Sequence, residues 1–176
     1  MERRVATVMT SRSITVQQSA RQGLYTPEER ARRDASVWTL VQGILAPFQF
    51  VVCLVSLVFV VRYLTSGEGQ AAADMSIIVK TFTLYTIMIT GSIWEKVVFG
   101  KWLFAEPFWW EDAVSMIVIA LHTTYLAMLL FGLGTVEARM LVALAAYATY
   151  AVNATQFLLK LRAARLEAQV PAGAAA

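Results

Sequence analysis

Cysteine and the usual catalytic motifs are scarce in this chain of 176 residues. The single cysteine, Cys53, excludes an internal disulfide framework and a cysteine-based zinc site, and its apolar surroundings favour a small buried side chain. There is no GxSxG, HExxH, CxxC or phosphate-loop pattern. A hydrolase of the soluble type and a dedicated metal centre are therefore not predicted, and no nucleic-acid partner is expected.

Charged residues are also few, and apolar residues are abundant. Charged residues make up 15% of the chain and hydrophobic residues 58%, with a mean hydropathy of +0.58. An ordinary soluble domain is about half apolar. Here the apolar residues form long blocks, which predicts an integral membrane protein. The first arginines are followed by a polar stretch, SRSITVQQSARQG, so no cleavable signal peptide is predicted.

Four apolar segments are each close to the ~20 residues that cross about 30 Å of hydrocarbon. The predicted fold is therefore all-α, an integral membrane four-helix bundle within residues 37–165. The four predicted spans are 37–64, 77–94, 113–133 and 139–161.

The residues outside the bundle are predicted to form one short helix and two tails. Residues 23–36 read as an amphipathic helix, capped by Thr26, with Pro27 at the first helical position and Glu29 completing a capping box. This arginine-rich helix lies either on the anionic membrane surface or free in solvent. Segments 1–22 and 166–176 are predicted to be disordered.

The basic residues predict the orientation. Residues 1–36 hold seven of the 15 lysines and arginines, whereas the connections 65–76 and 134–138 hold none. The other basic residues on the same side are Lys96, Lys101, Lys160, Arg162 and Arg165. By the positive-inside rule, both termini and the middle loop are predicted to be cytoplasmic. Arg62, Lys80 and Arg139 are placed at helix ends, where they can snorkel.

Helical spacing gathers polar side chains on one face of each predicted span. In the predicted orientation these faces converge on a cavity open to the cytoplasmic side. The polar residues singled out on them are Gln49, Glu95, Glu111, Asp112, His122, Asn153 and Gln156. His122 lies about 16 Å deeper than Glu111 along their helix, so these two residues cannot touch through that helix.

Three carboxyl groups at the cytoplasmic boundary are candidates for acid–base catalysis. Apolar surroundings and a neighbouring carboxylate both favour the protonated form of a carboxyl group, which a general acid requires. Glu95 ends its helix, where the helix dipole opposes ionisation, so it is the better proton donor. Glu111 and Asp112 begin the next helix and are the better bases toward water. The alternative is that all three are interfacial charges with a structural role.

His122 and the tryptophans are candidates for binding a flat ligand. His122 either ligates the metal of a tetrapyrrole, hydrogen-bonds a ligand carbonyl, or makes one hydrogen bond between helices. All five tryptophans fall near the predicted cytoplasmic boundary, whereas an aromatic belt normally serves both interfaces. This excess suits an aromatic ring stacked on indoles, with Trp94 and Trp110 as wall residues.

Four longer strings carry a family resemblance that runs from Leu24 to Arg165. They are LYTPEERARRDASVWTLVQGILAP, YTIMITGSIWEKVVFG, FWWEDAVSMIVIALHTTYL and YAVNATQFLLKLRAAR. They resemble the vinyl bacteriochlorophyllide hydratase family of phototrophic bacteria. The resemblance implies hydration of the C3 vinyl group of chlorophyllide a or a bacteriochlorophyllide to a 1-hydroxyethyl group, in bacteriochlorophyll a synthesis. It implies no separate cofactor, because the magnesium belongs to the substrate.

The resemblance carries over no catalytic residues, so the site assignments depend on the chemistry. We predict catalytic roles for Glu95, Glu111 and Asp112. Substrate binding is predicted for His122, which is a candidate axial ligand of the magnesium, and for Asn153, Gln156, Gln49, Trp94 and Trp110. The expected partners are the chlorin, membrane lipid and other enzymes of bacteriochlorophyll synthesis. The rival interpretations are a non-enzymatic chlorin carrier or photosystem assembly protein, and a structural subunit.

Overall fold

The computed structural model describes residues 23–169. Within them the secondary structure is helical throughout, and four of the helices are long and apolar enough to cross a membrane. The predicted all-α fold with four spans is thus confirmed. The elements are α2 (Pro27–Ala35), α3 (Val37–Ser66), α4 (Gln70–Phe99), the 3-10 turn η1 (Glu106–Phe108), α5 (Trp109–Leu130) and α6 (Val136–Gln169).

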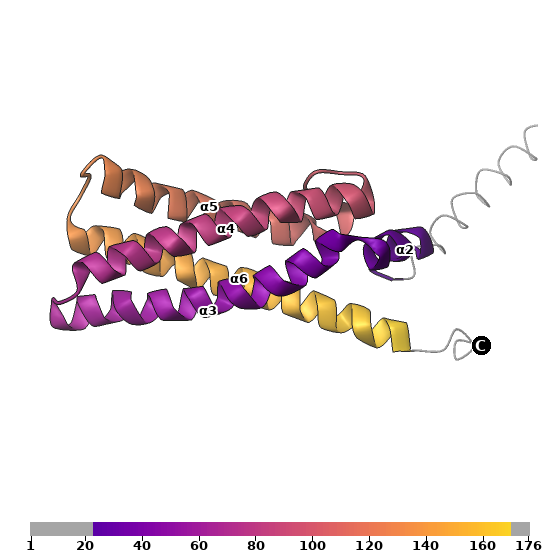
Figure 1. Cartoon of the computed structure of the whole chain (residues 1–176), viewed down its shortest axis with the longest axis horizontal. Coiled ribbons are helices and arrows are strands. Elements are labelled where there is room, and N and C mark those ends of the chain that lie inside the picture. Colours follow the sequence, from indigo (N-terminus) through magenta and orange to yellow (C-terminus); the bar gives the residue numbers. More distant parts are fainter. Residues whose placement is uncertain (1–22, 170–176) are drawn as a thin grey trace, which may run out of the picture.

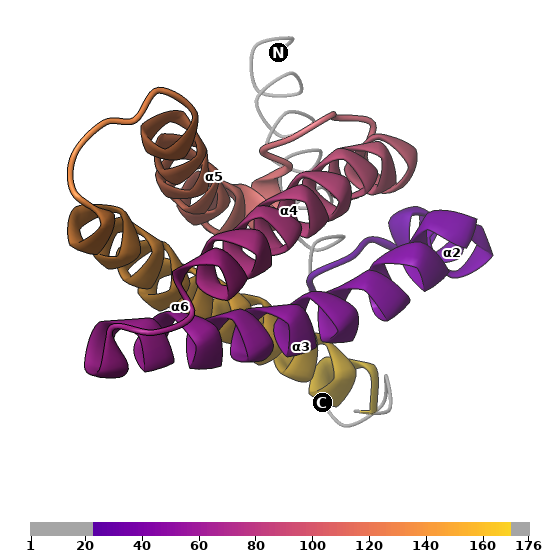
Figure 2. The same ribbon diagram turned by 60° about the vertical axis from the view of Figure 1, so that its left-hand side comes forward.

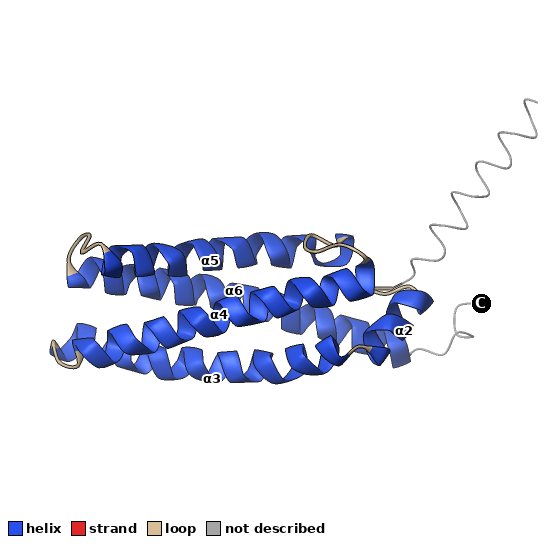
Figure 3. Ribbon diagram, turned by 45° about the horizontal axis from the view of Figure 1, so that its top comes forward, coloured by secondary structure: helices blue, strands red, loops and turns tan. Residues whose placement is uncertain are grey.

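The four long helices form two antiparallel hairpins (Figure 1). One hairpin is α3 with α4 and the other is α5 with α6, while α3 and α6 contact each other less extensively than either contacts its hairpin partner. Helices α3 and α6 cross each other, as the turned view in Figure 2 shows. The short connections after α3 and α5 lie at one end of the bundle, and the α4–α5 loop lies with α2 at the other (Figure 3). We call the latter the α2 end.

The helices extend beyond the predicted spans, and this changes the position of one lysine. The second helix begins at Gln70 rather than 77, because the alanine-rich stretch after Gln70 continues the helix. Lys80 therefore lies about three turns inside α4, where its side chain is fully buried. The prediction that Lys80 snorkels at a helix end is wrong.

The fourth helix also differs from its prediction at both ends. It begins at Val136 rather than 139, because the Thr135 hydroxyl accepts a hydrogen bond from the Ala138 N–H (3.1 Å), as a capping residue does. Residues 166–169, which were assigned to the C-terminal tail, continue this helix to Gln169. The rest of that tail and the whole predicted tail 1–22 lie outside the described residues.

The short helix α2 closes one end of the bundle. Its predicted capping box is confirmed, with Glu29 N–H donating to Thr26 Oγ1 (3.2 Å) and Thr26 N–H donating to Glu29 Oε2 (2.8 Å). Arg32 Nε donates to the Val98 carbonyl (2.8 Å), and the Tyr25 ring lies just before α2 and stacks on Phe99 (centroids 5.7 Å apart). This segment is therefore packed against the end of α4.

The bundle is apolar outside and mixed inside. Large apolar side chains such as Leu40, Ile44 and Phe48 are exposed along α3, as expected of a surface that faces lipid. The interior contains an apolar core and a column of buried polar side chains, which helix–helix interfaces in membranes use as hydrogen-bonding groups. The buried polar residues are Gln49, Ser56, Lys80, Thr81, Glu95, Glu111, Asp112, Ser115, His122, Arg139 and Asn153.

Candidate active site

The three predicted catalytic carboxyl groups meet at the α2 end of the bundle. Glu95 lies near the end of α4, and Glu111 and Asp112 lie in the first turn of α5. Each residue is at most 5% exposed. They are therefore buried groups, and either acid–base chemistry or a structural role can be assigned to them.

Two of these carboxylates hold the loop that joins the hairpins. Glu95 Oε2 accepts a hydrogen bond from the Ala105 N–H (3.1 Å), and Asp112 Oδ2 accepts one from the Phe104 N–H (2.8 Å). Phe104 has a φ of 58°, in the left-handed region that favours glycine. The two hydrogen bonds offset this local cost, so the carboxyl groups fix the shape of the loop.

The Glu95 and Asp112 carboxyl groups lie close together, because they accept hydrogen bonds from the N–H groups of two consecutive loop residues, Ala105 and Phe104. A carboxyl group donates a proton when protonated and accepts one when ionised. The loop therefore gathers two groups that are capable of acid–base chemistry.

Glu111 has a different partner. Lys160 of α6 donates hydrogen bonds to Glu111 Oε2 and to the Pro107 carbonyl, and its ammonium nitrogen lies 5.0 Å from the centre of the Phe108 ring. This ion pair joins α6 to the start of α5. Glu111 is consequently a charge-balanced hydrogen-bond acceptor rather than a member of the carboxyl pair.

The structure does not bring the two predicted wall tryptophans together. The Trp94 indole N–H donates to Thr39 Oγ1 (2.9 Å), and its ring packs edge-on against Phe99 and Phe108 (5.6 Å each). Trp110 is 69% exposed on the outside of the bundle. Trp94 thus belongs to the packed aromatic cluster at the α2 end, and Trp110 faces outward.

Deeper in the bundle, each long helix contributes a buried polar group that lacks a hydrogen-bond partner among residues 23–169. These atoms are both amide atoms of Gln49, Nζ of Lys80, Nε2 of His122, Nε of Arg139, Oδ1 of Asn153 and Oε1 of Gln156. An unsatisfied buried polar group costs about 1–3 kcal/mol. So many in one interior are characteristic of a ligand site with convergent polar groups. All four inner residues predicted to bind substrate are among them.

His122 has a defined tautomer. Its Nδ1 lies 2.8 Å from the Val118 carbonyl one turn earlier in α5. A carbonyl only accepts hydrogen bonds, so Nδ1 carries the proton and Nε2 of the neutral ring presents a lone pair. Metal-binding histidines are oriented in this way by the hydrogen bond of their other nitrogen. The observed bond lies within one helix, which differs from the interhelical bond considered as an alternative.

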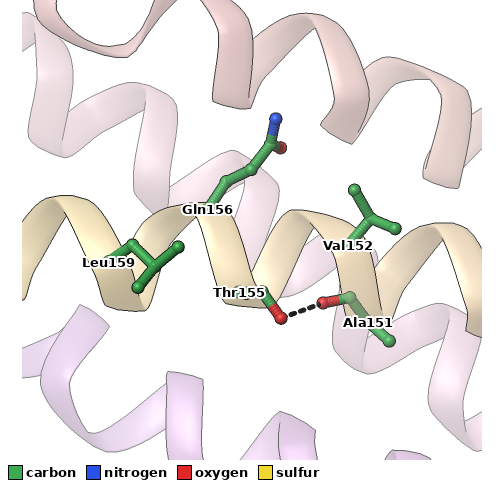
Figure 4. A pocket seen from close by; sticks show the side chains of 5 residues that line it. All are labelled: Ala151, Val152, Thr155, Gln156 and Leu159. Carbon is green, nitrogen blue, oxygen red and sulfur yellow. Dashed lines mark hydrogen bonds between the residues drawn. The ribbon is translucent and has the colours of Figure 1, made fainter.

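An open recess of about 360 Å³ lies along the outer face of α6. Its lining residues all come from α6 and are Ala151, Val152, Thr155, Gln156 and Leu159. Figure 4 shows the Gln156 side chain on the opposite side of α6 from Thr155, whose hydroxyl donates to the Ala151 carbonyl (2.8 Å). One turn further from the α2 end, Asn153 Nδ2 donates to Ser115 Oγ (2.7 Å) and links α6 to α5.

Comparison with known proteins places this site in a family. Residues 25–163 match the family model described as 2-vinyl bacteriochlorophyllide hydratase. This chain belongs to the 2-vinyl bacteriochlorophyllide hydratase family. The protein of that name from Rhodobacter capsulatus is 62% identical over 152 residues, which cover 86% of this chain and 88% of that protein. The one from Cereibacter sphaeroides is 64% identical over 144 residues, 82% and 89% of the two chains.

The family membership confirms the resemblance that was based on four strings. No solved structure matches this chain. Within residues 23–169, no group of three or more His, Cys, Asp or Glu side chains is arranged to hold a metal ion.

One buried polar residue, Lys80, is absent from the predicted site. The sequence prediction puts Lys80 at a helix end because it assigns the polar segment before it to a loop. The signal that could have found it is the run of helix-forming residues from Gln70 to Ala73, which lengthens α4 toward the loop. With that start, Lys80 and Ile77 fall on one face, and both are fully buried.

Proposed function

We infer that this chain is a hydratase that adds water to the vinyl group of a bacteriochlorophyllide in bacteriochlorophyll synthesis. One observation carries the inference: two relatives with that name are 62% and 64% identical over more than four fifths of the chain. The substrate that we propose is chlorophyllide a or a bacteriochlorophyllide with a C3 vinyl group, and the product is the 3-(1-hydroxyethyl) derivative.

The reaction divides into two proton movements and one bond to oxygen. A proton adds to the terminal carbon of the vinyl group, which becomes a methyl group. Positive charge develops at the inner carbon, where the conjugated ring delocalises it. The oxygen of water adds to that carbon and releases one proton, so no proton is consumed overall. No electrons are transferred, and we therefore propose that no redox cofactor takes part.

The carboxyl pair supplies the acid in this proposal. Glu95 donates the proton, and Asp112, which lies close to it, takes part in restoring it. Glu111, paired with Lys160, orients the attacking water as a hydrogen-bond acceptor. Burial of all three groups supports these roles, because a water-excluding site strengthens their interaction with the developing charge.

The unpaired polar groups deeper in the bundle bind the ring in this proposal. His122 Nε2 is directed to the central magnesium of the substrate, and Gln49, Asn153 and Gln156 bind polar groups at its edge. The recess beside Gln156 is the proposed entrance, since it opens on the side of the bundle that faces lipid. Stacking of the chlorin on Trp94 and Trp110 stays a prediction.

We propose that the α2 end faces the cytoplasm, in the inner membrane of a bacterium, among lipid and other enzymes of bacteriochlorophyll synthesis. The concentration of lysine and arginine at this end supports the orientation. A thiol reagent that cannot cross the membrane, added from outside the cytoplasm to chains carrying Cys53→Ala, should label Glu68→Cys and leave Lys101→Cys unlabelled. The reverse pattern would exclude this orientation.

The activity itself is tested with purified protein and chlorophyllide a. We expect a product that has gained one water, identified by mass and by the blue shift that follows loss of the conjugated vinyl group. Tight binding without conversion would instead support a chlorin carrier. If the protein neither converts nor binds the pigment, the structural-subunit interpretation replaces both.

A further inference from the structure

Burial of the Lys80 side chain costs more free energy than burial of an uncharged one, because a charged group loses its hydration. The Lys80 side chain is 0% exposed near the middle of α4, and its ammonium nitrogen lies 3.6 Å from the centre of the Tyr150 ring. Among residues 23–169 it has neither a hydrogen-bond acceptor nor an acidic partner for its charge. Cationic side chains inside a membrane are rare, pair with an opposite charge or face a cavity, and mark functional sites.

The groups around Lys80 are also unsatisfied. His122 packs against the ring of Tyr147 (centroids 5.8 Å apart), one turn of α6 before the Tyr150 ring that Lys80 contacts. Hydrogen bonds from Gln42 to Thr90 and between Ser56 and Ser76 set the register of α3 against α4. Gln49, midway between Gln42 and Ser56, therefore lies about one turn of α4 from Lys80, and it is 1% exposed with both amide atoms unpaired. The Tyr147 hydroxyl bonds to Ser56 Oγ (2.6 Å) and not to Lys80, whose Nζ has no hydrogen-bond partner among residues 23–169.

This combination defines the chemistry of the missing partner. Lys80 offers up to three N–H donors and a positive charge, and Gln49 offers two further N–H donors. A metal cation would be repelled by the ammonium group, whereas a carboxylate would satisfy both side chains. A carboxylate brought into the bundle would in turn need a cation, since an unpaired buried charge is expensive.

We propose that Lys80, assisted by Gln49, binds the free propionate carboxylate of the chlorin substrate. This carboxylate distinguishes a chlorophyllide from an esterified chlorophyll, so Lys80 is a specificity residue for the free acid. The proposal deepens the proposed function and depends on it for the identity of the ring. The role proposed for His122 is separate, because the magnesium lies at the centre of the ring and the propionate at its edge, so the two side chains would contact different parts of one ligand.

Lys80 contacts α6 through the buried ring of Tyr150. A carboxylate bound by Lys80 would therefore lie between α4 and α6. An ester at the same place would leave the ammonium group unpaired, and sites with an unpaired buried polar group reject such analogues strongly.

The test compares chlorophyllide a with its methyl ester, which keeps the ring, the magnesium and the vinyl group. We expect the wild-type protein to hydrate the free acid with a kcat/KM at least about tenfold higher than that of the ester. Lys80→Met, which keeps the length of the side chain, should lower kcat/KM for the acid to the level of the ester. Lys101→Met, which removes an exposed lysine, should keep the wild-type preference.

Two results would overturn the proposal: equal efficiency of acid and ester in the wild-type protein, or a preserved preference in Lys80→Met. Should Lys80→Met fail to fold, the acid–ester comparison in the wild-type protein still decides, and Lys80→Gln provides a second variant. Should neither pigment be hydrated, the proposed function fails separately. Binding of the acid and the ester, followed by fluorescence, then tests Lys80 alone, and equal affinities would overturn its role.

Discussion

Glu95→Gln and Asp112→Asn should each lower kcat for vinyl hydration by about 10²–10⁴-fold, the usual contribution of a general acid or base. Each amide is nearly the same size as the acid that it replaces but has no proton of suitable acidity. The rate is measured as formation of the hydroxyethyl product from chlorophyllide a. We expect the affinity for the pigment to change little, because neither group is assigned to ring binding.

These two replacements are informative because they preserve the hydrogen bonds of the loop. The amide oxygen of the new side chain can still accept from the Ala105 or Phe104 N–H. Glu137→Gln is the matched control, since Glu137 is an exposed carboxylate in the first turn of α6, at the opposite end of the bundle. It should keep full activity. Wild-type rates in both amide variants, with the fold intact, would rule out the carboxyl pair as the acid.

His122→Leu should weaken binding of the magnesium chlorin about tenfold or more, the equivalent of about 1.4 kcal/mol per factor of ten. Binding of the metal-free analogue should stay unchanged, because that ring has no axial position for Nε2. The measurement is a fluorescence titration of both pigments. The variant should fold, since the hydrogen bond that it removes joins His122 only to Val118 of its own helix.

A suitable control for this variant is Thr124→Val. The Thr124 hydroxyl also donates to a carbonyl one turn earlier in α5, that of Ala120 (2.8 Å), but it does so on the exposed side of the helix. Its replacement should leave both titrations unchanged. Equal weakening of the two pigments in His122→Leu would indicate a packing role and would contradict metal ligation.

The sequence predicted the parts of this molecule that depend on local pattern. Four apolar blocks predict four spans, and the 3.6-residue period places Gln49, His122 and Asn153 on interior faces. The capping box at Thr26 is likewise a local signal. The ends of the spans were less predictable, because alanine-rich and polar turns continue a helix beyond the apolar block. The start of α4 was therefore predicted too late in the sequence, and Lys80 was predicted to lie at a helix end.

The pairing of the carboxyl groups could not be predicted from spacing. Glu111 and Asp112 are adjacent in the sequence, yet one pairs with Lys160 of α6 and the other lies close to Glu95 of α4. This division depends on the 100–105 loop turning back over the carboxyl groups and on the distance between hairpins. The same tertiary packing separates Trp94, inside the aromatic cluster, from the exposed Trp110.

Glu95 and Asp112 hold the loop and are also the residues that we propose to move the proton, so a replacement at either position affects both the proposed activity and the architecture. Apolar replacements would release Phe104 and Ala105 and loosen the link between the hairpins. Replacement by amides removes the two acidic groups and keeps the hydrogen bonds that hold the loop. A relative with Gln and Asn at these two positions is therefore expected to keep the fold and the binding of the pigment and to lack the hydratase activity.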